Sequence, residues 1–188
     1  EVGMGEEHEM SGLFENYRNL LEKVDRFCEE SAEFYGDALT CAKGCSGCCR
    51  HFGLFPVEAV YLRLALEDLE RGTLETVIQK AAGLLEDPEG PCPMLQDDLC
   101  LLYPVRPVIC RTHGLPVLVR TEEGAGVDVC PLNFTEGQTP DSRYILDLEQ
   151  LNTTLASINE LFVKQAFDEG AVPERFLLAE ALLLDLDS

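Results

Sequence analysis

The sequence has few basic residues for its length. Fourteen Lys and Arg stand against 35 Asp and Glu among 188 residues, which gives a formal net charge of -21. A surface with this charge repels nucleic-acid phosphates and anionic lipid headgroups. Nucleic acid and membranes are therefore not expected as partners, and we interpret the acidity chiefly as a source of solubility.

The chain also lacks a long apolar run. Its longest, 176–184, is interrupted by Glu180 and is shorter than the roughly 20 residues that a membrane-spanning helix needs. The residues at 1–9 are acidic and polar, without the basic and apolar segments of an export signal. We expect a cytoplasmic protein in which residues 1–10 form a disordered leader.

Cysteine, by contrast, is abundant. Of nine cysteines, eight lie between Cys41 and Cys130. A disulfide framework is the alternative explanation, but it is typical of short secreted chains, and this chain shows neither property. With 46% hydrophobic residues, the chain can also build a core without the help of metal or disulfides. We therefore expect the clustered cysteines to bind a transition metal.

The hydrophobic pattern predicts a mainly α protein. Apolar residues recur three and four positions apart, which places them on one face of a helix. Cys28 lies on such a face and is interpreted as a small buried hydrophobe, outside the metal set. Helices are predicted over 12–38, 56–71, 73–86, 141–162 and 173–184, the second and third packed as an antiparallel pair, and Asp141 is expected to cap the fourth.

Between these helices the chain is rich in Pro, Cys and Gly. The segments 115–120 and 126–129 flank a polar turn and predict a small β-hairpin. We expect a single helical domain over 1–188 with Cys-rich loops and this hairpin. Within it, 41–130 would be the metal-binding core and 141–186 would carry the C-terminal helices.

Four thiolates that converge on one centre suit zinc and also suit an iron–sulfur cluster, so either is the expected cofactor. The short spacings at 41–49 let one loop supply several of them. Eight thiolates allow two four-sulfur sites, or one such site beside a group of functional thiols. The predicted metal ligands are Cys41, Cys45, Cys48, Cys49, Cys92, Cys100, Cys110 and Cys130.

Basic residues and histidines also lie close to these cysteines in the sequence. Four thiolates around Zn²⁺ or a cluster core of charge 2+ leave about -2 on each site, which nearby cations would offset. Arg106 and Arg111 are the predicted cofactor-binding residues; Lys43 and Arg50 are placed similarly, with ordinary surface ion pairs as the alternative. Each of two loop histidines follows a cysteine closely. The interpretations for each are a metal ligand, an acid or base, or a hydrogen-bonded loop residue. The two histidines are His51 and His113.

These residues carry a family resemblance. Between 41 and 130 the chain resembles the YkgJ-type cysteine-cluster family of zinc- or iron-chelating proteins. A related arrangement occurs in flagellin lysine methylases, so the resemblance allows an enzymatic role. Members often carry another cysteine soon after the Cys-Arg pair, whereas here His113 and Gly114 occupy that place and Cys130 comes later. The matching residues are Cys41-x3-Cys45-x2-Cys48-Cys49, Cys92-Pro93-Met94-Leu95-x4-Cys100 and Tyr103-x2-Arg106-Pro107-x2-Cys110-Arg111.

Three functions follow as hypotheses. The first is a metal-binding protein whose centre is structural or transfers electrons. The second is a redox or protein-modifying enzyme that uses the cluster. The third is a metal chaperone or interaction module, which adds a protein partner to the metal ion or cluster. A radical enzyme using S-adenosylmethionine shares the spacing of Cys41, Cys45 and Cys48, but the chain lacks the strand–helix repeats of its barrel.

Overall fold

A computed structural model describes residues 12–87, 89–167 and 172–186. The chain forms two compact units. Among the described residues, unit 1 takes those of Glu1–Glu15, Lys43–Pro107 and Asn159–Ser188, and unit 2 takes Asn16–Ala42 and Val108–Ile158. The predicted leader at 1–10 lies outside the described residues, and the single domain stays a prediction.

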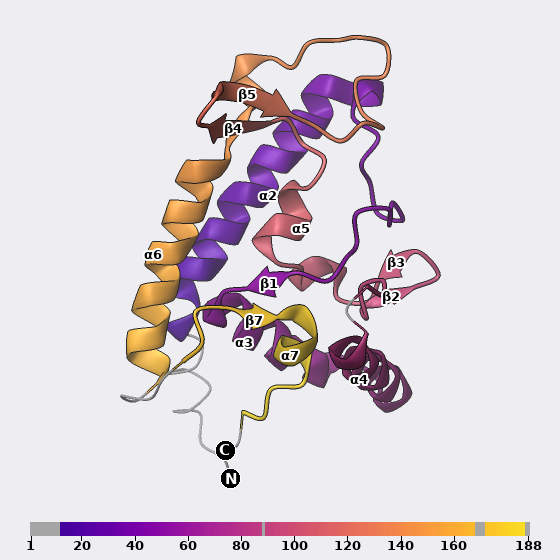
Figure 1. The fold of residues 1–188 in the computed structure, drawn as a ribbon, viewed down its shortest axis with the longest axis vertical. Helices are drawn as coiled ribbons and strands as arrows, with labels where there is room; N and C mark the ends of the chain where they lie inside the picture. Colours follow the sequence, from indigo (N-terminus) through magenta and orange to yellow (C-terminus); the bar gives the residue numbers. More distant parts are fainter. Residues whose placement is uncertain (1–11, 88, 168–171, 187–188) are drawn as a thin grey trace. The chain divides into compact units, whose positions relative to one another are not determined.

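Unit 1 is built on helices α3 (Pro56–Ala65), α4 (Arg71–Glu86) and α7 (Leu178–Leu182), and α7 packs against both of the others. Strand β1 (Gly53–Leu54) pairs antiparallel with β7 (Phe176–Leu177), which brings α7 beside α3 (Figure 1). The core residues Leu62, Val77 and Leu182 are fully buried. Cys92 and Met94 belong to the same core, so the second group of cysteines begins inside it.

A tight hairpin in unit 1 carries Cys100. Strands β2 (Leu95–Gln96) and β3 (Leu99–Cys100) are antiparallel, with Leu95 opposite Cys100. The two turn residues, Asp97 and Asp98, have φ of 50° and 62°. Positive φ at both positions is what a type I′ turn needs, and Asp tolerates it better than most residues.

Unit 2 contains most of α2 (Glu15–Tyr35), the short α5 (Val108–Thr112) and the beginning of α6 (Leu148–Ala166). The apolar stripe of α2 is buried at Tyr17, Leu21 and Val24. Unit 2 also contains a three-stranded sheet with the strand order β5-β4-β6. These strands are β4 (Val117–Thr121), β5 (Gly124–Asp128) and β6 (Leu146–Asp147).

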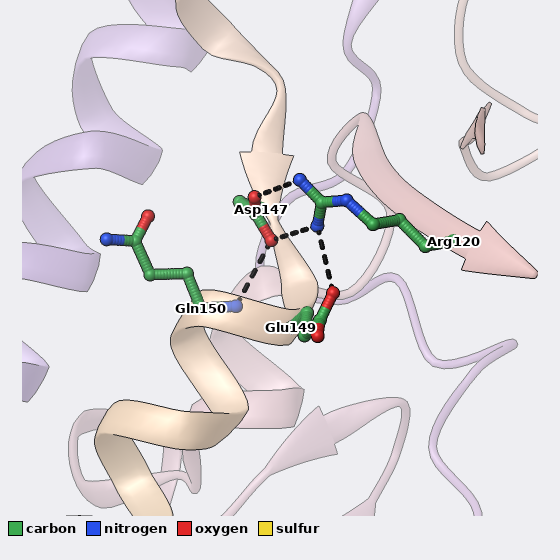
Figure 2. A network of polar contacts seen from close by, with 4 residues as sticks. All are labelled: Arg120, Asp147, Glu149 and Gln150. Atoms are coloured by element: carbon green, nitrogen blue, oxygen red, sulfur yellow. Dashed lines mark hydrogen bonds and ion pairs between the residues drawn. The ribbon is translucent and has the colours of Figure 1, made fainter.

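A polar network joins β4 to the start of α6 in unit 2 (Figure 2). The Arg120 guanidinium contacts both carboxylate oxygens of Asp147, at 2.8 and 2.7 Å, and Glu149 at 3.2 Å. Asp147 also accepts a hydrogen bond from the Gln150 N–H at 3.1 Å. Because α6 begins at Leu148, Asp147 is its N-cap residue.

The mainly α fold and the small hairpin are confirmed. The fourth predicted helix begins later than expected, because Asp141 caps a 3₁₀ turn and Asp147 caps α6 instead. The last helix is shorter, since 176–177 pair with β1 as a strand. Further 3₁₀ turns lie at Gly36–Ala38, Leu66–Asp68, Tyr103–Val105 and Ser142–Tyr144.

Over 12–87, 89–167 and 172–186, no helix combines the length and the apolar character that a bilayer crossing requires.

Candidate metal centre

The loop at 43–49 presents three cysteines of unit 1 at different depths. Cys45 and Cys48 are exposed, while Cys49 is half-buried against the core. A turn closes the loop through a hydrogen bond from the Cys49 N–H to the Ser46 carbonyl at 2.9 Å. The Ser46 hydroxyl donates to Asp98 in the β2–β3 turn at 2.6 Å, which ties the loop to the hairpin.

Two more cysteines of unit 1 lie beside this loop. Cys92 is only 7% exposed, and its N–H donates to the Cys49 carbonyl at 3.2 Å. Cys100 is half-buried on β3, directly opposite Leu95, whose N–H in turn donates to the Cys92 carbonyl at 3.1 Å. The fold therefore joins cysteines that are about 50 positions apart in the sequence.

The pKa values of these thiols reflect burial first and proximity second. Burial raises the pKa of Cys92 to about 12, and the nearby Cys100 and Cys49 add to the rise. Burial also raises the pKa of Cys49, to which Cys100 and Cys45 contribute, while a hydrogen bond with Cys48 opposes it. Without metal these thiols keep their protons at neutral pH, so a metal that binds them must displace protons.

Two cations lie near the same thiols. Burial raises the pKa of Cys100, while the Leu102 backbone and the charge of Arg106 lower it. The Arg106 guanidinium stacks 3.8 Å from the Tyr103 ring centroid and donates to the Tyr103 carbonyl at 2.8 Å. Lys80 on α4 lowers the pKa of Cys92. Thiolates formed here would find positive charge close by.

His51 follows Cys49 by two residues and has an unusual environment. Both of its ring nitrogens are buried, and neither has a hydrogen-bond partner among the described residues. Leaving a buried donor or acceptor without a partner costs roughly 1–3 kcal/mol. The sequence offered a hydrogen-bonded loop residue or a ligand for His51, and the structure provides no hydrogen bond within its described part.

In unit 2, Cys41 and Cys130 meet around Asn133 and Gly114. Asn133, only 4% exposed, donates from Nδ2 to Cys41 Sγ at 3.3 Å and to the Gly114 carbonyl at 2.7 Å. Its Oδ1 accepts from the Thr40 N–H at 2.8 Å. A Cβ on Gly114 would overlap Cys41 Sγ and would lie 3.5 Å from Cys130 Cβ. Asn133 thus fixes the loop that holds Cys41.

Cys110 and Arg111 lie on α5 of unit 2. Arg111 is buried and forms an ion pair with Asp25 of α2. Cys28 of α2 donates its S–H to the Arg111 carbonyl at 3.4 Å. His113 is exposed. The Arg111 guanidinium thus already pairs with the Asp25 carboxylate inside unit 2. Its role as a cofactor-binding residue stays a prediction.

The nine cysteines all lie in the described part of the chain, and no disulfide joins them. Within the described residues, no three His, Cys, Asp or Glu side chains already converge as metal ligands. The donor chemistry nevertheless fits a thiophilic metal, because soft thiolates and imidazole are the ligands that zinc and iron–sulfur centres use. Convergence would require rotations about side-chain bonds between staggered rotamers.

The segment that carries the clustered cysteines matches a known protein family. Residues 40–131 match the CxxCxxCC family, described as a "Putative zinc- or iron-chelating domain". This confirms the cysteine-cluster family that the motifs predicted. No curated protein and no solved structure matches the chain.

Two residues around the CxxCxxCC thiols escaped the sequence prediction. Lys80 is 12 positions from the nearest cysteine and reaches the site only because α4 packs on the same core. The only sequence signal for Asn133 is a weak one, its position shortly after Cys130-Pro131. In the structure its N–H closes a turn by donating to the Cys130 carbonyl at 2.9 Å. The ligand set itself stays a prediction.

Proposed function

We propose that this protein chelates a transition metal with the thiol group of unit 1, and that the thiols of unit 2 form a second group. The unit 1 group consists of Cys45, Cys48, Cys49, Cys92 and Cys100. The unit 2 group consists of Cys41, Cys110 and Cys130. The match to a zinc- or iron-chelating domain supports metal as the ligand.

One observation carries the proposal. A backbone hydrogen bond joins Cys92 to Cys49, and beyond the effect of burial Cys100 raises the pKa of both Cys49 and Cys92. Thiols this close repel one another once ionised, and a cation between them removes that repulsion. A bound zinc ion would supply a structural cross-link, whereas an iron–sulfur cluster would supply electron transfer.

The first experiment is metal and acid-labile sulfide analysis, with a visible spectrum, on protein purified without oxygen. Iron with sulfide and a broad visible absorption assigns an iron–sulfur centre; zinc in a colourless solution assigns a zinc protein. Cys49→Ser and Cys100→Ser are expected to lose metal, and Cys28→Ser, outside both groups, to retain it. Equal metal content in all four proteins, or none in any, would contradict the proposal.

Metal transfer to a protein partner is a second candidate, favoured by the graded exposure of the unit 1 thiols. Cys45 and Cys48 are exposed while Cys92 is buried. An incoming thiol could attack the exposed side and displace ligands stepwise. Bound metal should then move to a competing chelator within minutes, and Cys48→Ser should slow this exchange. Metal that stays inert in the unaltered protein rules out transfer. The enzymatic alternative stays a prediction.

A further inference from the structure

The segment that carries His51 is held at both ends. The Cys49 carbonyl accepts from the Cys92 N–H at 3.2 Å, and the Phe52 carbonyl accepts from the Leu178 N–H at 2.8 Å. Phe52 also packs against the core of unit 1. His51 as a whole is half-buried, but the fold of unit 1 buries both of its ring nitrogens, and these lack hydrogen-bond partners within the described chain.

Covalent geometry keeps this imidazole near the thiols. Two residues along a chain span at most about 7 Å between Cα atoms, so His51 cannot be far from Cys49. The Cys49 carbonyl accepts a hydrogen bond from the Cys92 N–H, and the Cys92 carbonyl accepts one from the N–H of Leu95, which lies directly opposite Cys100. Among the described residues, the imidazole whose buried nitrogens lack partners thus lies two positions after Cys49 of the unit 1 thiol group.

A neutral imidazole carries a proton on one nitrogen and a lone pair on the other. Buried lone pairs of this kind are satisfied by a hydrogen bond, by ordered water or by a metal. We propose that one ring nitrogen of His51 is a ligand of the metal that the unit 1 thiols bind, together with Cys49, Cys92 and Cys100. This inference rests on the proposed function.

The proposal changes the chemistry expected of unit 1. Three thiolates and one imidazole make a Cys₃His set, which is a common structural zinc site. The set also carries one negative charge fewer than four thiolates around the same ion. The exposed Cys45 and Cys48 are then left outside the inner set, where they remain available to incoming metal.

The test uses full-length protein stripped of metal, kept reduced, and titrated with Co²⁺ and Zn²⁺. Co²⁺ reports thiolate ligands through charge-transfer absorption and reports its full ligand set through its visible bands. His51→Leu should shift the visible bands. It should also weaken Zn²⁺ binding by more than about tenfold, measured in competition with a chromogenic chelator. Loss of a residue that only supports a metal ligand already costs about tenfold in affinity, so loss of a ligand should cost more. His113→Leu, at the exposed loop histidine, is the matched control and should match the unaltered protein.

One further variant and one further measurement separate metal ligation from packing. His51→Cys restores a ligand and should recover most of the Zn²⁺ affinity that His51→Leu loses. In excess chelator, His51→Leu should unfold at a urea concentration no lower than the unaltered protein, because it removes two unsatisfied buried atoms. A lower midpoint would mean that a hydrogen bond or bound water satisfies the ring, and would overturn the proposal.

The outcomes distinguish the two proposals. If the unaltered protein shows no thiolate-to-cobalt absorption, the proposed function and this inference both fail. If Cys49→Ser loses that absorption while His51→Leu keeps the spectrum and affinity of the unaltered protein, the thiols bind metal and only the role of His51 is wrong.

Discussion

Gly114 adopts a φ of +93°, and its missing side chain leaves room for Cys41. An L-residue in this conformation loses about 1–2 kcal/mol, and a new Cβ would also overlap the Cys41 sulfur. We expect Gly114→Ala to lower the free energy of unfolding by about 2 kcal/mol or more, measured by urea denaturation in chelator.

The matched control for this substitution is Gly83→Ala in the interior of α4. A Cβ there meets nothing within 4 Å. Alanine is the better helix former by roughly 0.5–1 kcal/mol, so this variant should be more stable than the unaltered protein. A Gly114→Ala protein as stable as the unaltered one would show that Cys41 and Gly114 do not pack as described.

Asn133 joins the segment 40–41 to Gly114 through one buried amide in unit 2. Replacement by alanine removes the partner of the N–H of the exposed Thr40 and of the carbonyl of the half-buried Gly114, and each such hydrogen bond contributes roughly 0.5–1.5 kcal/mol. Asn133→Ala should therefore destabilise the protein by a few kcal/mol, and the Cys41 thiol should react faster with a thiol reagent. Asn152→Ala, at an exposed position of α6, should change neither property.

At the scale of elements, the cap of α6 makes unit 2 sensitive to acid. Hydrogen bonds from Arg120 and from the Gln150 N–H lower the pKa of Asp147 from 3.8 to about 2. A carboxyl whose pKa is lowered by folding stabilises the folded state above its unfolded pKa. That contribution disappears as the pH falls from about 4 towards 2, because the acid then protonates the native carboxylate as well.

We therefore expect Asp147→Asn to unfold at a lower temperature than the unaltered protein at pH 6, and the difference to shrink as the pH falls towards 2. Thermal unfolding followed by circular dichroism across this range measures it. Hydrogen bonds with Arg143 lower the pKa of Asp141 to about 2 as well, so the Asp147→Asn protein should keep some sensitivity to acid. Glu122→Gln, an exposed carboxylate in the β4–β5 turn, controls for lost charge. Parallel pH curves would contradict the role of Asp147.

The same elements show what sequence reasoning can reach. The stripe of Tyr17, Leu21 and Val24 predicts α2 because helix periodicity is local, and the polar turn after Arg120 predicts the hairpin for the same reason. The pairing of β1 with β7 could not be predicted. Each strand has two residues, and 121 positions separate them along the chain, so neither leaves a pattern.

The sequence also could not predict which thiols lie together in each unit. Sequence proximity groups Cys41 with Cys45, yet they belong to different units, and Cys41 accepts a hydrogen bond from the Asn133 side chain in unit 2. Cys45 instead influences Cys49, which meets Cys92 through the backbone. Spacing predicts candidate metal ligands as a class, but which loops meet depends on long-range packing that no short motif encodes.

At the scale of the whole molecule, 35 acidic residues against 14 basic ones produce self-repulsion that opposes compactness. Exposed ion pairs such as Lys164 with Glu160 offset little of it, since each contributes about 0–1 kcal/mol. Added salt weakens both effects. Repulsion among the many unpaired acids is the larger, so the chelator-treated protein should unfold at a higher temperature as salt is added.

The last turns of α2 concentrate this repulsion. Glu29, Glu30 and Glu33 are exposed near the C-terminal end of the helix, where the helix dipole already favours cations, and its last turn contains no basic residue. We expect Glu29→Gln, Glu30→Gln and Glu33→Gln, combined in one variant, to raise the unfolding temperature at about 10 mM salt, where the screening length is about 30 Å. At about 150 mM, where that length is about 8 Å, the advantage should shrink. Calorimetry at both salt concentrations measures the two differences. An advantage that is equal at both would mean that the gain comes from glutamine itself and that charge repulsion does not limit the stability of this protein.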